Sequence, residues 1–209
     1  MVRSASLLGL VAAVAALIAL APAFALDPRF PDWPCAQLKV PSLAISSVWH
    51  GAAIDPGAPA PAIAAGEAEL AARLAARRTP IEEARKLVAA FVAGADEERQ
   101  AKGQSLFLAL YARLNGQREE VMSGIERFSR KQKGAAEGIR ERTRDMQKMQ
   151  DDPGADAAAI DDFAAKIAWE TRIFEDRQMT TAAVCEVPVI IEKRLFDLGH
   201  AIEDAMRAK

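Results

Sequence analysis

Two long series of mostly apolar side chains, with members three or four residues apart, constrain the fold of this chain more than any other feature. The first series consists of Phe107, Leu110, Leu114, Gln117, Val121, Ile125, Phe128, Gln132, Ala135, Ile139, Arg142, Met146 and Met149. The second consists of Ile160, Phe163, Ile167, Glu170, Phe174, Arg177, Thr181, Val184, Pro188, Ile191, Leu195, Leu198 and Ile202. This spacing places each series on one helix face and is typical of a coiled-coil seam.

The residues between the two series, 151–154, read Asp-Asp-Pro-Gly and favour a turn. A short turn between two helices predicts an antiparallel hairpin. If Met146 lies opposite Ile160, then Phe107 lies opposite Leu198, so the two seams stay in phase over their whole length. Each arm of about 45 residues would then be roughly 70 Å long at 1.5 Å per residue.

Two positions weaken the helices at one level of this hairpin. Asn115-Gly116 is a poor helix pair, and Pro188 lacks the backbone N–H that a helix interior needs. In the derived pairing Gln117 faces Pro188, so both arms are weak at the same height. We favour a shared kink in two continuous helices. The alternative is two full loops, which would fold the chain into a shorter bundle of about five helices.

Two shorter helices are predicted ahead of the hairpin, at 67–78 and 80–93. In the first, Leu70 and Leu74 are spaced i, i+4. Their apolar faces need a partner, and a four-helix base of the hairpin provides one. The sequence therefore predicts an all-α helical domain over residues 66–209: a long, coiled-coil-like antiparallel helical hairpin with two short helices packing at its base.

Residues 26–65 form a proline-rich segment that we expect to run extended over the surface, because proline lacks the N–H that helices and central strands require. Its prolines are Pro28, Pro31, Pro34, Pro41, Pro56, Pro59 and Pro61. The expected apolar anchors of this segment are Trp33, Leu38, Val40, Leu43, Ile45, Val48 and Trp49.

Residues 1–25 read as a cleavable signal peptide. Arg3 is followed by an uncharged apolar run from Ser4 to Leu20, and Ala23-Phe24-Ala25 matches the small-residue pattern of a cleavage site after Ala25. An uncleaved anchor helix is the alternative, but the apolar run is shorter than the roughly 20 residues that a span needs. We therefore expect a periplasmic or secreted protein with no membrane span in the mature chain.

Cys35 and Cys185 are the only cysteines in the chain. In an oxidising compartment, an even number of cysteines predicts a disulfide. A redox or metal-binding pair is the alternative, but the cysteines form no Cys-x-x-Cys motif and have no neighbouring histidine. We predict a structural disulfide between Cys35 and Cys185.

The charge distribution gives no indication of nucleic-acid binding, since the whole chain has a formal net charge of −2. Residues 127–148 are rich in lysine and arginine, whereas residues 156–177 have an excess of acidic residues. These stretches face each other in the predicted hairpin. We therefore interpret the basic stretch as one half of a complementary pair of arms, and not as a nucleic-acid face.

Cation binding is considered at the turn over residues 151–162, which contains the carboxylates of Asp151, Asp152, Asp156, Asp161 and Asp162. Hard cations such as Ca²⁺ need several such oxygens. The EF-hand pattern fails, however, because Pro153 and Ala155 occupy two ligand positions. The same aspartates can act as helix caps and favourable charges at a helix start, and this is the favoured interpretation of the turn.

Metal centres and cofactors are not expected elsewhere. Neither of the two histidines, His50 and His200, shows an acidic residue or cysteine at a metal-ligand spacing that we recognise. Trp33 and Trp49 could line an apolar ligand site, although their role as anchors of the proline-rich segment is the favoured interpretation.

The expected function is protein binding without catalysis. The long seam, its polar distal half and the lack of a recognisable catalytic motif are typical of an assembly factor, a chaperone-like protein or a scaffold whose partner is another exported protein. The alternative is a periplasmic protein that binds a small ligand or cation at the Asp-rich turn. An enzyme with an unfamiliar site is the third and least favoured hypothesis.

Overall fold

The computed structural model describes residues 27–54 and 65–208. Within these ranges the chain forms four α-helices and one short 3-10 helix, with no β-strand, so the predicted all-α class is confirmed for them. The predicted signal peptide, residues 1–25, lies outside the described residues, as do Pro56, Pro59 and Pro61. No described helix is both long and apolar enough to cross a membrane.

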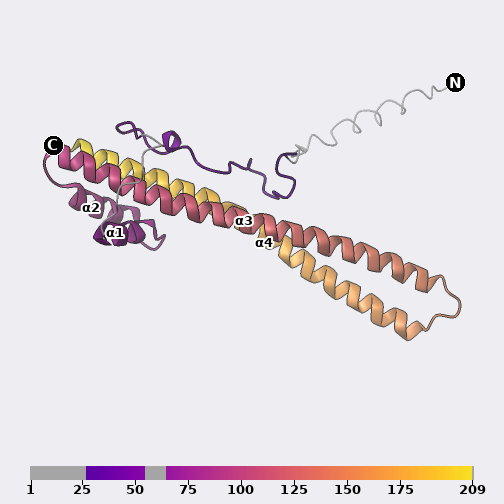
Figure 1. The fold of residues 1–209 in the computed structure, drawn as a ribbon. Coiled ribbons are helices and arrows are strands. Elements are labelled where there is room, and N and C mark those ends of the chain that lie inside the picture. Colours follow the sequence, from indigo (N-terminus) through magenta and orange to yellow (C-terminus); the bar gives the residue numbers. More distant parts are fainter. Residues whose placement is uncertain (1–26, 55–64, 209) are drawn as a thin grey trace, which may run out of the picture.

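Two very long helices, α3 (Asp96–Gln150) and α4 (Ala157–Arg207), make up most of the structure. They run antiparallel and side by side, and the turn at 151–156 joins them (Figure 1). A helix of 55 residues is about 80 Å long at 1.5 Å per residue. Asp156 caps the start of α4, because its carboxylate accepts a hydrogen bond from the N–H of Ala158 at 3.0 Å.

Neither of the two weak points interrupts its helix. α3 continues through Asn115 and Gly116, and α4 continues through Pro188. The alternative of two full loops and a five-helix bundle is therefore wrong. An asparagine weakens a helix when its side chain bonds to the local backbone, but the side chain of Asn115 has other partners. It donates to Glu119 Oε1 at 2.8 Å and accepts from the N–H of Leu43 at 3.3 Å.

The base of the molecule consists of α1 (Ala65–Ala75), α2 (Ile81–Val92) and the adjoining ends of α3 and α4, residues 96–115 and 190–207. α1 and α2 pack against the end of the helix pair that lies far from the connecting turn (Figure 1). The largest fully buried side chains of this core are Leu74, Val88, Leu106, Phe107, Leu110, Leu114, Leu195, Leu198 and Ile202. Burial of one such side chain stabilises a fold by about 1.5–3 kcal/mol.

The N-terminal segment, residues 27–54, lies along the helix pair and contains one turn of 3-10 helix at Ile45–Ser47 (Figure 1). It is attached at two levels. Near the middle of the helix pair, Trp33 packs with Met122 and Ile125. At the base, the Trp49 ring stacks on Phe107 with a centroid distance of 4.4 Å. The buried anchors Trp33, Val48 and Trp49 agree with the sequence prediction.

Leu38 and Val40 were also predicted as anchors, and for them the prediction is wrong, since they are 73% and 48% exposed. The physical reason is the alternation of side chains in an extended chain. Between them, Lys39 points to the helices and forms an ion pair with Glu126 at 2.6 Å. Gln37 likewise donates a hydrogen bond to the carbonyl of Cys185. The polar side chains therefore face the helices, and the apolar ones face outward.

A disulfide joins Cys35 to Cys185, whose Cα atoms are 5.6 Å apart. The predicted pairing is confirmed. The bond fastens the N-terminal segment to α4 close to the Trp33 contact, and within the described residues it leaves no free cysteine.

The N-terminal segment also changes which residues of the long helices are buried. Gln117 is exposed, whereas its neighbour Arg118 is 3% exposed and forms an ion pair with Glu192 at 2.5 Å. On α4, Val184 is 38% exposed, whereas Cys185 is buried. The seam prediction is therefore wrong at Gln117 and Val184. A third element packs beside the seam at this level, so burial shifts by one residue towards it.

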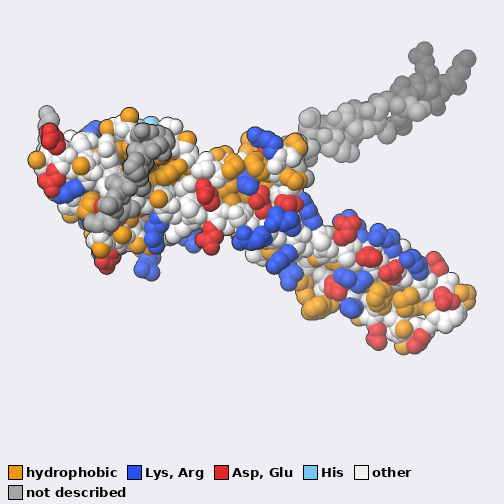
Figure 2. Space-filling view, viewed as in Figure 1, with side chains coloured by type: hydrophobic (Ala, Val, Ile, Leu, Met, Phe, Trp, Pro, Cys, Tyr) orange, Lys and Arg blue, Asp and Glu red, His pale blue; other side chains and the backbone are white. Residues whose placement is uncertain are grey.

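The distal arm, residues 133–182, contrasts with the base. Ile167 is its only buried residue. The other apolar seam residues of the arm, such as Ile139 and Phe163, are half-buried. Figure 2 shows apolar side chains there among many charged ones. Arg142 and Glu170 form an ion pair across the two helices, with Nε and Oε2 2.5 Å apart at an angle outside hydrogen-bond geometry.

Candidate functional sites on the helix pair

An apolar hollow lies between α3 and α4 where the distal arm begins, with a volume of about 320 Å³. Its lining residues are Val121, Gly124, Ile125, Phe128, Thr180, Thr181 and Val184. A second hollow of about 280 Å³ follows within the arm. Its lining residues are Ala135, Ile139, Arg142, Trp169, Glu170, Ile173, Phe174 and Arg177.

The two hollows are successive parts of one groove. From one hollow to the next, the lining continues seven residues on along α3, from Phe128 to Ala135, and three residues on along α4, from Arg177 to Thr180, which keeps it on the same side of each helix. We call the two hollows together the apolar groove. Trp169, which is 64% exposed, stands in its distal part. The N-terminal segment packs on an adjoining face, where Trp33 contacts Met122 and Ile125, and no described residue of the segment lines either hollow.

Trp33 and Trp49, considered above as the lining of a ligand site, are structural anchors. Both are 5% exposed. The indole N–H of Trp33 donates to the carbonyl of Gln37 at 2.7 Å, and that of Trp49 donates to the carbonyl of Ala52 at 2.8 Å. Their polar atoms are therefore used within the N-terminal segment itself, as expected for buried indoles.

The Asp-rich turn does not bring its carboxylates together. Asp156 caps α4, and Asp152 accepts a hydrogen bond from the N–H of Gly154 at 2.9 Å. Asp151, Asp161 and Asp162 are exposed. Among the described residues, these five aspartates form no group with three ligand atoms within 4.8 Å of one another. A cation site at this turn stays a prediction without converging ligands.

The basic stretch at 127–148 forms ion pairs with two other parts of the chain, α4 and the N-terminal segment. Arg142 pairs with Glu170 of α4, as the complementary arms predict. Arg130 and Lys133 instead pair with Asp32 of the N-terminal segment, at 3.2 and 3.0 Å. The hydrogen bonds from Lys133 and then Arg130 hold the pKa of the Asp32 carboxyl below its usual value. Part of the positive charge therefore docks the N-terminal segment.

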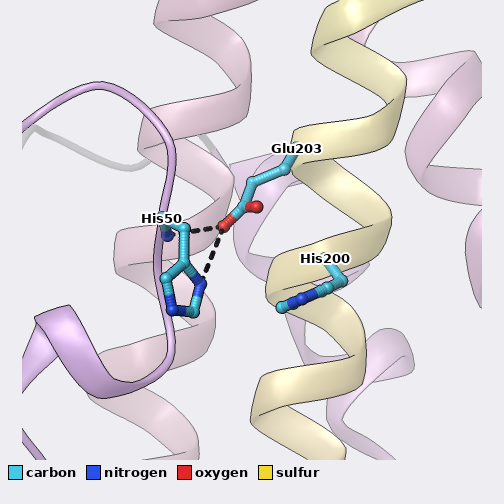
Figure 3. A group of neighbouring side chains, drawn as sticks. All are labelled: His50, His200 and Glu203. Atoms are coloured by element: carbon cyan, nitrogen blue, oxygen red, sulfur yellow. Dashed lines mark hydrogen bonds and ion pairs between the residues drawn. The ribbon is translucent and has the colours of Figure 1, made fainter.

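A second candidate site lies at the base, where His50, His200 and Glu203 meet (Figure 3). His50 comes from the N-terminal segment, and the other two come from the last turns of α4. The backbone N–H of His50 donates to Glu203 Oε1 at 2.7 Å, and its Nδ1 is 4.0 Å from the same oxygen. The two imidazole rings are 5.6 Å apart between centroids. One ligand atom from each residue lies within 4.8 Å of the others.

The expectation that neither histidine has an acidic ligand nearby is wrong. His200 and Glu203 are three residues apart in α4, a spacing that places both side chains on one helix face. The His200-x-x-Glu203 spacing is therefore a signal that the sequence contains. His50 carries no such signal, because it reaches the cluster only through the packing of Val48 and Trp49 on the base.

The described residues thus contain two arrangements with functional potential. The apolar groove offers uncovered apolar surface, and the His50–His200–Glu203 cluster offers nitrogen and oxygen ligands. No protein-family model, curated protein or solved structure matches this chain.

Proposed function

We propose that this chain is an exported, non-enzymatic protein that binds other proteins, and that the apolar groove receives an amphipathic helix of the partner. The observation that carries the proposal is Trp169, a tryptophan that stands 64% exposed in the groove. The role is that of an assembly factor, chaperone-like protein or scaffold for another exported protein.

The exposure of Trp169 supports a binding role because its large apolar surface is left in water. The other two tryptophans, Trp33 and Trp49, are buried. Exposed apolar surface that continues into a groove is typical of interaction sites. Tryptophan is also among the residues that contribute most to binding energy at protein interfaces.

The shape of the groove favours a helical partner. Helix-in-groove recognition uses apolar anchors at i, i+3, i+4 and i+7 of the bound helix. The groove is bounded by two helices and changes from an apolar proximal part, at Phe128 and Val184, to a distal part that includes Arg142 and Glu170. A partner helix with apolar anchors at one end and polar residues at the other matches this order.

The weak core of the distal arm supports the same proposal. Because Ile167 is the only buried residue of the arm, few contacts oppose a small separation of α3 and α4. Regions with few buried apolar contacts open at low free energy. The groove can therefore adjust its width to an incoming helix.

The compartment is supported by the Cys35–Cys185 bond, since disulfides form and persist in oxidising environments. The signal-peptide pattern at residues 1–25, with cleavage after Ala25, supports export to the periplasm or medium.

The test uses a photo-crosslinking amino acid at position 169, compared with the same amino acid at position 179. Met179 is a matched control: it lies on the same helix and is 71% exposed, but it lines neither hollow of the groove. We expect adducts to one defined protein from position 169 and none from position 179.

The captured protein is then purified and titrated with Trp169→Glu and Met179→Glu variants. Loss of a binding hot spot of about 2 kcal/mol weakens affinity roughly 30-fold, and we expect this for Trp169→Glu alone. Equal crosslinking at the two positions, or equal affinity of the two variants, contradicts the proposal.

A further inference from the structure

The only two histidines of the chain lie 150 positions apart in sequence and meet at one place in the fold. Their common neighbour is Glu203, whose side chain is 4% exposed. Nothing in the protein-binding proposal uses these residues. They meet at the base (Figure 3), whereas the lining of the apolar groove reaches along α4 only as far as Val184.

Glu203 is a buried carboxylate with little compensation for its charge. Among the described residues its one hydrogen-bond donor is the backbone N–H of His50. No described lysine or arginine pairs with it, and the ring nitrogen recorded near it is Nδ1 of His50, at 4.0 Å. Burial of a carboxylate is strongly unfavourable unless a cation or several donors compensate for it.

His200, the next ligand candidate, has a ring nitrogen without a hydrogen-bond partner. Its Nδ1 is buried and has no hydrogen-bond partner in the described structure. The ring is held by Phe196, with a centroid distance of 4.2 Å. A bound cation would meet both needs. It would accept the free electron pair of the His200 nitrogen and balance the charge of the Glu203 carboxylate.

We propose that His50, His200 and Glu203 bind a divalent transition-metal ion, with Zn²⁺ as the best-matched ion. Two imidazole nitrogens and one carboxylate oxygen are a common zinc ligand set, and water supplies a further ligand when the protein provides three. Imidazole nitrogen favours Zn²⁺, Cu²⁺ and Ni²⁺ over Mg²⁺ and Ca²⁺, which prefer oxygen alone.

Such an ion would link the N-terminal segment to α4 at the base. The segment is already fastened near its start by the Cys35–Cys185 disulfide. At Val48 its backbone passes so close to α4 that a Cβ on Gly199 would lie 2.5 Å from the Val48 carbonyl oxygen. The metal would fasten the segment two residues later, at His50, so that both of its ends are attached to α4.

The proposal is tested with Co²⁺ and Zn²⁺ added to the purified, oxidised protein made without a polyhistidine tag. Co²⁺ bound by nitrogen and oxygen ligands gives visible absorption bands that report its ligands directly. Isothermal titration with Zn²⁺ gives the affinity and the number of ions bound. We expect one ion per chain, and Zn²⁺ should displace Co²⁺ and abolish the absorption bands.

His50→Ala is the decisive variant, because the His50 side chain is 56% exposed and its backbone bond to Glu203 survives the substitution. We expect His50→Ala and Glu203→Gln each to weaken Zn²⁺ binding at least about tenfold, since even indirect metal contacts contribute that much. The matched control is Glu186→Gln, which changes an exposed glutamate of the same helix. It should bind as the unmodified protein does.

Two results would overturn the metal site: no binding of Co²⁺ or Zn²⁺ by the unmodified protein, or binding that His50→Ala leaves unchanged. Zn²⁺ binding that is lost instead in an Asp161→Asn/Asp162→Asn variant would move the site to the Asp-rich turn. None of these outcomes bears on crosslinking at position 169, so the two proposals stand or fall separately.

Discussion

The base and the distal arm are built from the same two helices, yet they differ in what holds those helices together. At the base, α1, α2 and the N-terminal segment surround α3 and α4, and residues such as Phe107 and Leu195 are completely buried. In the distal arm no other described helix packs on α3 and α4, the N-terminal segment contacts Lys133 at its start, and Ile167 is the only buried residue. A pair of helices cannot fully enclose its own seam, so the number of packed neighbours sets the stability of each region.

The largest expected difference comes from removing the same side chain in each region. Phe107→Ala at the base should lower the free energy of unfolding by about 3–5 kcal/mol, because the phenylalanine is fully buried. Phe163→Ala in the arm should lower it by about 1–2 kcal/mol, because that ring is half-buried. Urea denaturation followed by circular dichroism measures both. Similar losses would mean that the arm is as well packed as the base.

Two glycines give a comparison in which the expected effects have opposite signs. Gly199→Ala should destabilise the base by about 1–3 kcal/mol, as overpacking does, because the new methyl would meet the Val48 backbone at 2.5 Å. Gly134→Ala in the arm should stabilise the protein by about 1 kcal/mol, since nothing lies within 4 Å and alanine favours the helix. Thermal melts of the two variants should shift in opposite directions. A gain in stability from Gly199→Ala would show that the N-terminal segment is not held against α4.

The smallest expected effect lies at the border of the two regions, where Asp32 pairs with Lys133 and Arg130. These contacts lower the pKa of Asp32, so their contribution is present above the ordinary carboxyl pKa of about 3.9. It is lost as the pH falls through that value towards the lowered one. Below about pH 4, cleavage of the N-terminal segment by an acid-active protease should therefore accelerate, a few-fold at most for an exposed pair.

The control for this effect is Asp145, which pairs with Lys148 within α3. Asp32→Asn should make the segment equally accessible to the protease above and below about pH 4. Asp145→Asn should leave the pH dependence of cleavage unchanged. If Asp32→Asn retains the full pH dependence, another group holds the segment.

The sequence predicts the all-helical class and the disulfide because both depend on features that need no knowledge of tertiary packing: apolar spacing of three and four, and an even number of cysteines behind a predicted signal peptide. It predicts burial poorly where a third element joins the helices. Gln117 and Arg118 exchange roles because the N-terminal segment covers the face of α3 next to the seam. The position of Leu38 depends in the same way on which side of an extended chain meets the helices.

In the candidate sites, too, features that depend on sequence spacing are predictable and features that depend on tertiary packing are not. His200 and Glu203 share a helix face, and their spacing could have been recognised. The position of His50 beside them could not be predicted, because it depends on tertiary packing around Trp49 and Phe107. The sequence does not predict the apolar groove, for a related reason. A seam pattern shows which residues face the partner helix, but not that two helices without further neighbours leave Trp169 exposed.

The disulfide also orders events in time. Cys185 is synthesised 150 residues after Cys35, so the bond cannot close until α3, the connecting turn and α4 as far as Cys185 have been made. Until then Cys35 is a free thiol on a chain that has not yet received the helix to which it will be attached. The bond therefore cannot guide early folding. A chain truncated before Cys185 would leave Cys35 without its disulfide partner.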